Sequence, residues 1–192
     1  MCDMKKIYDI AKNKNIVVIE DAAQAIGSTF HGNRPGKYSD IATFSAHPLK
    51  ILNAIGDGGF LVTDNKNVYN FINKYKNHGL VGRDNVEIFG VNSRLDSINA
   101  GVLSYRLKKM NQIIKKRQKN IDLYKKLITA KEFQIINEKK NCINSNTMFI
   151  SVCERRDQLH DYLRGKEIEA LIYYGKALHQ HTAFLKKFGN KK

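Results

Sequence analysis

Two adjacent carboxylates and an amide follow a run of β-branched residues near the start of the chain. Residues 16–19 read Ile-Val-Val-Ile, and Glu20, Asp21 and Gln24 come soon after them. Such a run is typical of a strand covered on both faces in a parallel sheet, and open α/β sheets bind ligands at the carboxyl ends of their strands. Asp21 could therefore pair with a cationic ring nitrogen of a ligand; the alternative is a helix cap or turn residue.

A single lysine follows a second strand-like segment. Residues 41–46 read Ile-Ala-Thr-Phe-Ser-Ala, and the chain continues through His47 to Lys50. A lysine on a short loop after such a strand could form a Schiff base if its pKa were lowered. Because the chain holds 25 lysines, the competing interpretation of Lys50 is an ordinary solvated surface charge.

Two further segments carry weaker signals. Residues 56–59 read Gly-Asp-Gly-Gly, which fits neither a Walker A loop nor a dinucleotide fingerprint. Such a segment lets the backbone pass close to a ligand or to Lys50, or forms a plain turn. Farther along, Asn92 could donate to a phosphate and Arg94 could pair with a carboxylate, although an Asn before a helix is usually a cap.

The elements that must position these residues follow an α/β order in the first half of the chain. A helix is predicted over residues 3–14, with Asp3 as its cap, and a second helix over residues 65–77. A buried strand is predicted over residues 16–19, and two more strands are predicted over residues 41–45 and 59–63. Residues 79–93 are expected to form a long irregular loop, and loops of this length inside a compact domain are often functional.

The pattern changes in the second half. Helical periodicity dominates residues 96–128, a length that would carry the chain from one domain to another. Three strands are predicted beyond it, over residues 133–136, 148–153 and 168–172, with a helix over residues 155–165. We therefore expect an α/β large domain over residues 1–110, followed by a small α+β domain, reached through an interdomain helix, over residues 111–192.

Composition excludes several classes of protein. With 192 residues, 42% hydrophobic and 27% charged, the chain is expected to be globular, and no apolar run approaches the length of a membrane helix. The net charge of +15 raises the possibility of nucleic-acid binding. Lysine supplies 25 of the 33 basic residues, whereas nucleic-acid recognition draws on arginine, so we expect no nucleic-acid partner.

The cysteines indicate a reducing compartment. Cys2, Cys142 and Cys153 are odd in number, widely spaced and without CxxC spacing, so they are predicted to be free thiols, and no metal site is predicted. The start of the chain shows no apolar segment or cleavage site of an export signal. A cytoplasmic location is therefore expected.

The motifs together resemble one family. The segments at residues 18–25, 44–50, 56–63 and 90–95, and the Tyr173-Tyr174 pair with residues 177–179, are similar to those of the DegT/DnrJ/EryC1/StrS family. Its members are sugar aminotransferases that use pyridoxal 5'-phosphate (PLP). The resemblance implies the aspartate aminotransferase (type I) fold, with part of the large domain followed by a truncated small domain.

The resemblance also implies roles for five residues. Lys50 would form the Schiff base with PLP and then carry a proton between cofactor and substrate, and Asp21 would keep the pyridine nitrogen protonated. Gln24 would lie beside the ring and Ser45 would donate to the phosphate. Asn92 would reach the phosphate of a neighbouring subunit, which implies a homodimer with shared active sites. The substrates would be a keto-sugar nucleotide and an amino donor, commonly glutamate, for surface polysaccharide or amino-sugar synthesis.

Three departures from the family pattern bear on this expectation. Ile51 stands where the family usually has Asn after the lysine, and Ala177 replaces a proline. The chain also starts about one helix before the Asp21 strand, so it is expected to be a C-terminal portion of such an enzyme. The alternatives are a non-catalytic remnant or interaction subunit that needs a separate N-terminal chain, and a basic nucleic-acid-binding protein. A PLP-dependent dehydratase would carry histidine in place of Lys50.

Overall fold

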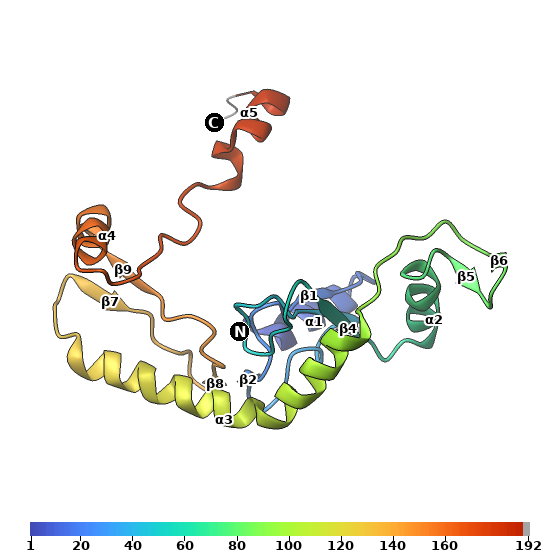
Figure 1. Ribbon diagram of the computed structural model, residues 1–192, viewed down its shortest axis with the longest axis horizontal. Helices are drawn as coiled ribbons and strands as arrows, with labels where there is room; N and C mark the ends of the chain where they lie inside the picture. Colours follow the sequence, from blue (N-terminus) through green and yellow to red (C-terminus); the bar gives the residue numbers. More distant parts are fainter. Residues whose placement is uncertain (190–192) are drawn as a thin grey trace. The chain divides into compact units, whose positions relative to one another are not determined.

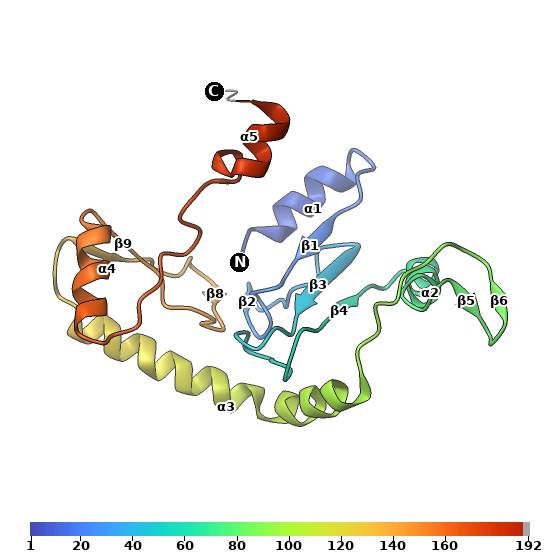
Figure 2. The same cartoon turned by 45° about the horizontal axis from the view of Figure 1, so that its top comes forward.

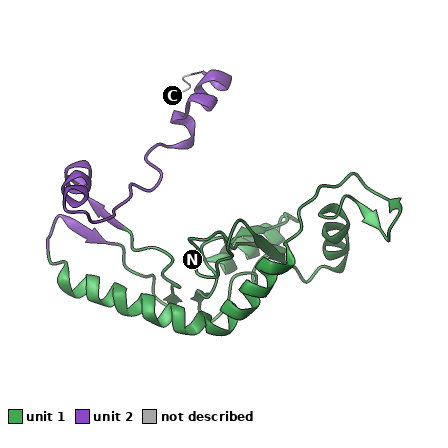
Figure 3. Ribbon diagram, in the orientation of Figure 1, with its two compact units in different colours: residues 1–129, 136–150 green, residues 130–135, 151–192 purple. Residues whose placement is uncertain are grey.

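The computed structural model describes residues 1–189, which fall into two compact units (Figure 1, Figure 3). The first unit holds residues 1–129 and 136–150, and the second holds residues 130–135 and the chain from residue 151 onward. Helix α3 (Ser97–Leu127) lies wholly in the first unit, so residue 110 is inside a continuous helix.

A three-stranded sheet forms the centre of the first unit. It consists of β1 (Ile19–Asp21), β3 (Ile41–Ser45) and β4 (Gly59–Val62), in the order β1-β3-β4. β1 runs parallel to β3, and β4 runs antiparallel to it (Figure 2). The predicted strand over residues 41–45 is confirmed with the same bounds, and the strand predicted over residues 59–63 ends one residue early.

The strand predicted over residues 16–19 starts later and is less covered than expected. β1 begins at Ile19, and the residues Ile16, Val17 and Ile19 are 57%, 66% and 65% exposed. β1 is an edge strand of its sheet, so one side of it pairs with no strand in the described part of the chain. The expectation of cover on both faces is wrong here, because an edge strand of so small a sheet has few neighbours.

Three capped helices flank this sheet in the chain. α1 (Met4–Lys12) begins after Asp3, α2 (Lys66–Tyr75) after Asn65, and α3 after Asp96, and each cap side chain accepts a backbone N–H of the first turn. These helices confirm the predictions over residues 3–14, 65–77 and 96–128. The expected loop over residues 79–93 contains a short hairpin instead, β5 (Leu80–Val81) paired with β6 (Asn85–Val86).

A return of the chain completes the first unit. β2 (Thr29–Phe30) pairs antiparallel with β8 (Cys142–Ile143), so residues 136–150 come back to the unit after α3 has ended. β2 and β8 have two residues each, which is too short to give a recognisable sequence pattern. The core cluster contains buried side chains from the loop after β3 and from α3, with Ile26 packed against them: Ala46, Leu52, Ala54 and Leu103.

The second unit is a small α+β assembly. β7 (Phe133–Ile135) pairs antiparallel with β9 (Ser151–Cys153), and α4 (Arg156–Gly165), the 3-10 helix η1 (Leu178–Gln180) and α5 (Thr182–Phe188) follow. The strand predicted over residues 168–172 is wrong: this segment has no strand, and Ile168 and Leu171 are 53% and 74% exposed. None of the helices in residues 1–189 has the length and apolar character that a membrane span requires.

Candidate active site

Asp21 and Ser45 lie at the same edge and on the same face of the sheet. Asp21 is the last residue of β1 and is opposite Thr43 of the parallel strand β3, and Ser45 ends β3 two residues later. Side chains two residues apart on a strand point to the same face. The structure therefore brings these two predicted site residues together at the carboxyl end of parallel strands, where α/β sheets place ligands (Figure 2).

A local turn holds the Asp21 carboxylate. Its Oδ1 accepts the backbone N–H of Ala23 at 3.0 Å, and the backbone N–H of Ala22 donates to Thr43 O at 2.9 Å. Oδ2 of Asp21 has no hydrogen-bond partner within residues 1–189, and the residue is exposed. The alternative reading of Asp21 as a turn residue is thus also correct, and one carboxylate oxygen still faces solvent.

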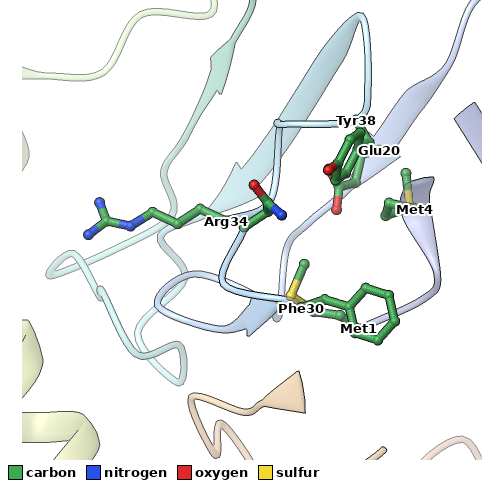
Figure 4. Close-up of a pocket in the computed structure, with 7 residues that line it drawn as sticks. Met1, Met4, Glu20, Phe30, Arg34 and Tyr38 are labelled. Atoms are coloured by element: carbon green, nitrogen blue, oxygen red, sulfur yellow. The ribbon is translucent and has the colours of Figure 1, made fainter. Parts of the chain in front are cut away.

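Glu20 lies on the opposite face and has a structural role. It is buried at 8% exposure, and its Oε2 accepts the backbone N–H of Gly36 at 2.7 Å. It lines a small pocket in which the Arg34 guanidinium extends away from the other side chains (Figure 4). The other residues that line the pocket are Met1, Met4, Phe30, Asn33 and Tyr38. The pleat of β1 therefore separates the two adjacent carboxylates.

The Gln24 side chain has an oxygen atom without a hydrogen-bond partner among the described residues. The backbone carbonyl of Gln24 accepts the Thr147 hydroxyl at 3.1 Å, which fixes the segment after β1 against the returning chain. Its side-chain Oε1 is buried and has no hydrogen-bond partner among the described residues. A buried polar atom without a partner is costly, so this amide is suited to meet a polar ligand.

Lys50 follows Ser45 through a tight turn. The Ser45 hydroxyl oxygen accepts the backbone N–H of His47 at 3.2 Å, and the backbone N–H of Lys50 donates to His47 O at 2.8 Å. Ile51 and Leu52 are 1% and 5% exposed, so the chain just after the lysine is anchored in the core. Lys50 is half-buried, and its ammonium group has no ion-pair or hydrogen-bond partner in the described chain.

The glycine segment brings backbone close to β3. Gly59 is opposite Ser45, and a Cβ added at Gly59 would lie 2.7 Å from the Phe44 carbonyl oxygen. A side chain does not fit at that distance, so only glycine allows this strand pairing without a shift. Of the interpretations left open for residues 56–59, close backbone approach is supported, but the contact is with β3 and not with Lys50.

Asn92 and Arg94 do not join the other site residues. Asn92 pairs by backbone with Asn77, and its Oδ1 accepts Arg94 Nε at 3.3 Å. No described contact links either residue with Asp21 or Lys50. The helix after them is capped by Asp96, so the reading of Asn92 as a helix cap is wrong.

The second unit holds the remaining motif. The rings of Tyr173 and Tyr174 meet edge to face with centroids 4.5 Å apart. The backbone N–H of Ala177 donates to Gln180 Oε1 at 3.0 Å, and His179 lies within η1. These contacts are local to this unit.

Residues that sequence reasoning missed hold the loop after β3. Asn53 Nδ2 donates to Pro48 O at 2.8 Å, and Asn99 Oδ1 accepts the backbone N–H of Ile55 at 2.9 Å. Asp96 could have been recognised as a helix cap from its position before an apolar-periodic segment. Nothing in the sequence indicates the partner of Asn99, which is 44 residues away.

One protein family matches the chain along its whole length. The model of the DegT/DnrJ/EryC1/StrS aminotransferase family matches residues 1–192. The chain is 32% identical over 187 residues to a pleiotropic regulatory protein of Geobacillus stearothermophilus, covering 96% of this chain and 50% of the relative. It is 32% identical over 173 residues to the GDP-perosamine synthase of Escherichia coli O157:H7, covering 88% and 47%.

Solved structures agree with these relatives. The crystal structure of S. venezuelae DesV, in complex with a ketimine intermediate, superposes with a TM-score of 0.92 at 29% identity. The match covers 97% of this chain and 51% of that one. The chain thus spans about half the length of the relatives it matches, and the partial transferase fold expected from sequence is confirmed.

Proposed function

The chain belongs to the DegT/DnrJ/EryC1/StrS aminotransferase family, and from this premise we propose that it carries the lysine half of a PLP-dependent active site. The complete protein would transfer an amino group, with glutamate as donor, to a keto-sugar nucleotide in amino-sugar or surface polysaccharide synthesis. The observation that carries the proposal is the placement of Asp21 and Ser45 on one face of the sheet, with Lys50 five residues after Ser45. Relatives named as sugar transaminases and perosamine synthase support the substrate class.

The residues at this edge fit PLP by their chemistry. Four polar groups lie at the ends of β1 and β3 or just after them: a carboxylate with a free oxygen, a hydroxyl, an unpartnered buried amide oxygen and an amine that has no partner in the described chain. These are Asp21, Ser45, Gln24 and Lys50. When bound, PLP supplies an electron sink for the substrate carbon.

Each side chain has a role that follows from its charge. The Asp21 carboxylate would accept a hydrogen bond from the protonated ring nitrogen and favour that charged form. The Ser45 hydroxyl would donate to a phosphate oxygen. The Gln24 amide would satisfy its buried oxygen by contact with a polar group at the ring.

Lys50 would act first as an amine nucleophile and then as a base. Both tasks require the unprotonated amine, and the amine has no ion-pair or hydrogen-bond partner in the described chain. The tight turn with His47 limits where the side chain can reach. The same amine could then hold and return the proton that moves during transfer.

A homodimer with shared active sites and a cytoplasmic location complete the proposal. The segment that carries Asn92 projects apolar side chains, with Phe89 100% exposed and Val86 58% exposed. Large apolar side chains that are exposed to solvent are suited to a contact with another protein. We expect this contact to bring Asn92 to the phosphate site of a second subunit.

A second candidate is a non-catalytic subunit that functions only with a separate chain. The exposed apolar residues Ile16, Val17 and Ile19 favour a protein contact at the β1 edge. In this case the protein would bind another polypeptide but would not retain PLP on Lys50.

Trapping of the cofactor separates the two candidates. The protein would be mixed with PLP, reduced with borohydride and digested, and the labelled lysine identified by mass spectrometry. The proposed function expects the label on Lys50 and its loss in Lys50→Arg, with Lys66→Arg as a control on the exposed start of α2. Labelling spread evenly over surface lysines would contradict the aminotransferase proposal and favour the non-catalytic subunit.

A further inference from the structure

The loop that carries Lys50 is closed at its base by hydrogen bonds to one residue. The backbone N–H of Ala46 donates to Gly58 O at 2.8 Å, and the backbone N–H of Ala54 donates to Ala46 O at 2.8 Å. Within the loop, Asn53 Nδ2 donates to Pro48 O. These contacts shape the loop, but Ile55, the residue after Ala54, takes part in none of them.

The first turns of α3 and Leu95, which precedes the helix cap, supply further support to the loop. Leu95 lies against Gly58, where an added Cβ would be 3.0 Å from Leu95 Cδ1, and Leu103 packs with the core residues of the loop. Between them, Asn99 Oδ1 accepts the Ile55 backbone N–H at 2.9 Å. Asn99 and Leu103 are four residues apart and therefore share one side of α3, whereas Leu95 precedes the helix cap Asp96.

Packing does not fix Ile55. Its side chain is 73% exposed, so little apolar burial holds this point of the chain. The backbone hydrogen bond to Asn99 therefore holds Ile55 itself, next to Ala54, which is held by Ala46.

Asp96 determines which way the Asn99 amide points. Its Oδ1 accepts the Asn99 backbone N–H at 2.7 Å, and its Oδ2 accepts Asn99 Nδ2 at 2.9 Å. An ionised carboxylate can only accept, so the Asn99 amide must turn its nitrogen toward Asp96 and its oxygen toward Ile55. The two side chains act as one relay from the helix cap to the loop.

We propose that the Asp96–Asn99 pair positions Lys50 by fixing the loop that carries it, residues 47–56. The inference rests on the proposed function of Lys50 and adds to it two positioning residues that do not touch the cofactor themselves. The relay holds the loop backbone while the lysine side chain remains free to react.

An exchange of the two side chains tests the relay. In Asp96→Asn, the new amide can still cap the helix through its oxygen, but its nitrogen faces the nitrogen of Asn99, so the relay breaks. In Asn99→Asp, two carboxylates face each other. The double variant Asp96→Asn/Asn99→Asp restores every donor–acceptor pair, because an amide nitrogen at 96 then donates to a carboxylate at 99 that still accepts from Ile55.

Two measurements on the 192-residue chain follow the relay and its effect on Lys50. Hydrogen–deuterium exchange of the peptide containing Ile55 should accelerate about fivefold in each single variant, as expected for loss of one hydrogen bond, and return to the original rate in the double variant. With PLP and borohydride as the probe, the fraction of label on Lys50 should fall in the single variants and recover in the double variant. Asn111→Asp, on an exposed position of the same helix, is the control for charge.

The outcomes separate this inference from the proposed function. If the unaltered chain does not label Lys50 above its other lysines, the proposed function fails, whatever the exchange rates show. If it does label Lys50, unchanged exchange in both single variants, or a double variant that behaves like them, overturns the relay. If hydrogen–deuterium exchange at Ile55 changes as the relay predicts but Lys50 labelling does not change, the positioning role of the Asp96–Asn99 pair is overturned. Circular dichroism shows whether a variant is folded, and a single variant that unfolds while the double variant folds supports the coupling.

Discussion

Ser145 donates its backbone N–H to the Ser28 hydroxyl at 3.0 Å, and that hydroxyl donates to Ser145 Oγ at 3.1 Å. Ser28 is 3% exposed and Ser145 is 1% exposed. This buried pair joins the segment after Gln24 to the chain that returns after α3. The position of the Gln24 amide therefore depends on residues more than a hundred positions away.

Ser28→Ala is expected to destabilise the chain by about 1–3 kcal/mol, because it leaves the backbone N–H of Ser145 buried without a partner. Urea unfolding followed by circular dichroism measures the change. Ser104→Ala is the matched control, since Ser104 is exposed on α3 and its hydroxyl donates to the carbonyl of its own helix. Equal midpoints for the two variants would contradict the role of the buried pair.

Gly59→Ala is expected to destabilise by about 1–3 kcal/mol, because the new methyl group would be forced against the Phe44 carbonyl oxygen. Gly101→Ala is expected to have the opposite effect on stability. Its Cβ would meet nothing within 4 Å inside α3, so it should stabilise by about 0.5–1 kcal/mol through helix propensity. Thermal unfolding of the two variants should shift in opposite directions, and a stabilised Gly59→Ala would exclude the close strand approach.

Asp21→Asn, in the enzyme reassembled with the remainder of its fold, is expected to retain PLP and to lose most of its turnover. A neutral amide does not stabilise the protonated ring nitrogen. Cofactor absorbance and single-turnover amino transfer measure the two effects. Glu20→Gln is the neighbouring control: it lies on the other face, so it should lower stability and spare the chemistry. Near-normal transfer by Asp21→Asn would refute the role of Asp21.

Asp96 should give the α3 terminus a pH dependence at acid pH. Its hydrogen bonds from the Asn99 backbone and side chain lower the pKa of the Asp96 carboxyl below its ordinary value of 3.8. Since the folded-state pKa is lower than the unfolded one, the stabilisation is fully present above about pH 3.8 and is lost as pH falls through the folded pKa. A carboxyl titration by NMR should show a midpoint below 3.8, and Asp96→Asn should abolish this part of the acid dependence.

The isolated chain is expected to self-associate and to bind PLP weakly. Exposed apolar residues at an unpaired strand edge favour pairing with other chains. Sedimentation velocity should show oligomers that diminish in Val17→Lys, whereas Leu171→Lys in the second unit, which adds the same charge at a 74% exposed site, should have a smaller effect. A monodisperse dimer with stoichiometric PLP would be inconsistent with this expectation.

Local chemistry in the sequence determined much of the fold. Asp3 as a cap, the apolar periodicity of α2 and α3, and the β-branched and aromatic residues of β3 each act over a few neighbours, so these elements were predictable. The same local order placed Lys50 after β3. The family resemblance assigned the site residues, and their chemical roles remain predictions.

Only the tertiary structure decided how these elements meet. The pleat of β1 puts Glu20 in the core and Asp21 on the site face, because the register with β3 selects which face each side chain occupies. Pairings such as β2 with β8, and Asn99 with Ile55, join residues far apart in the chain. Hydrogen bonds over such separations depend on the packing of whole elements and leave no periodic trace in the sequence.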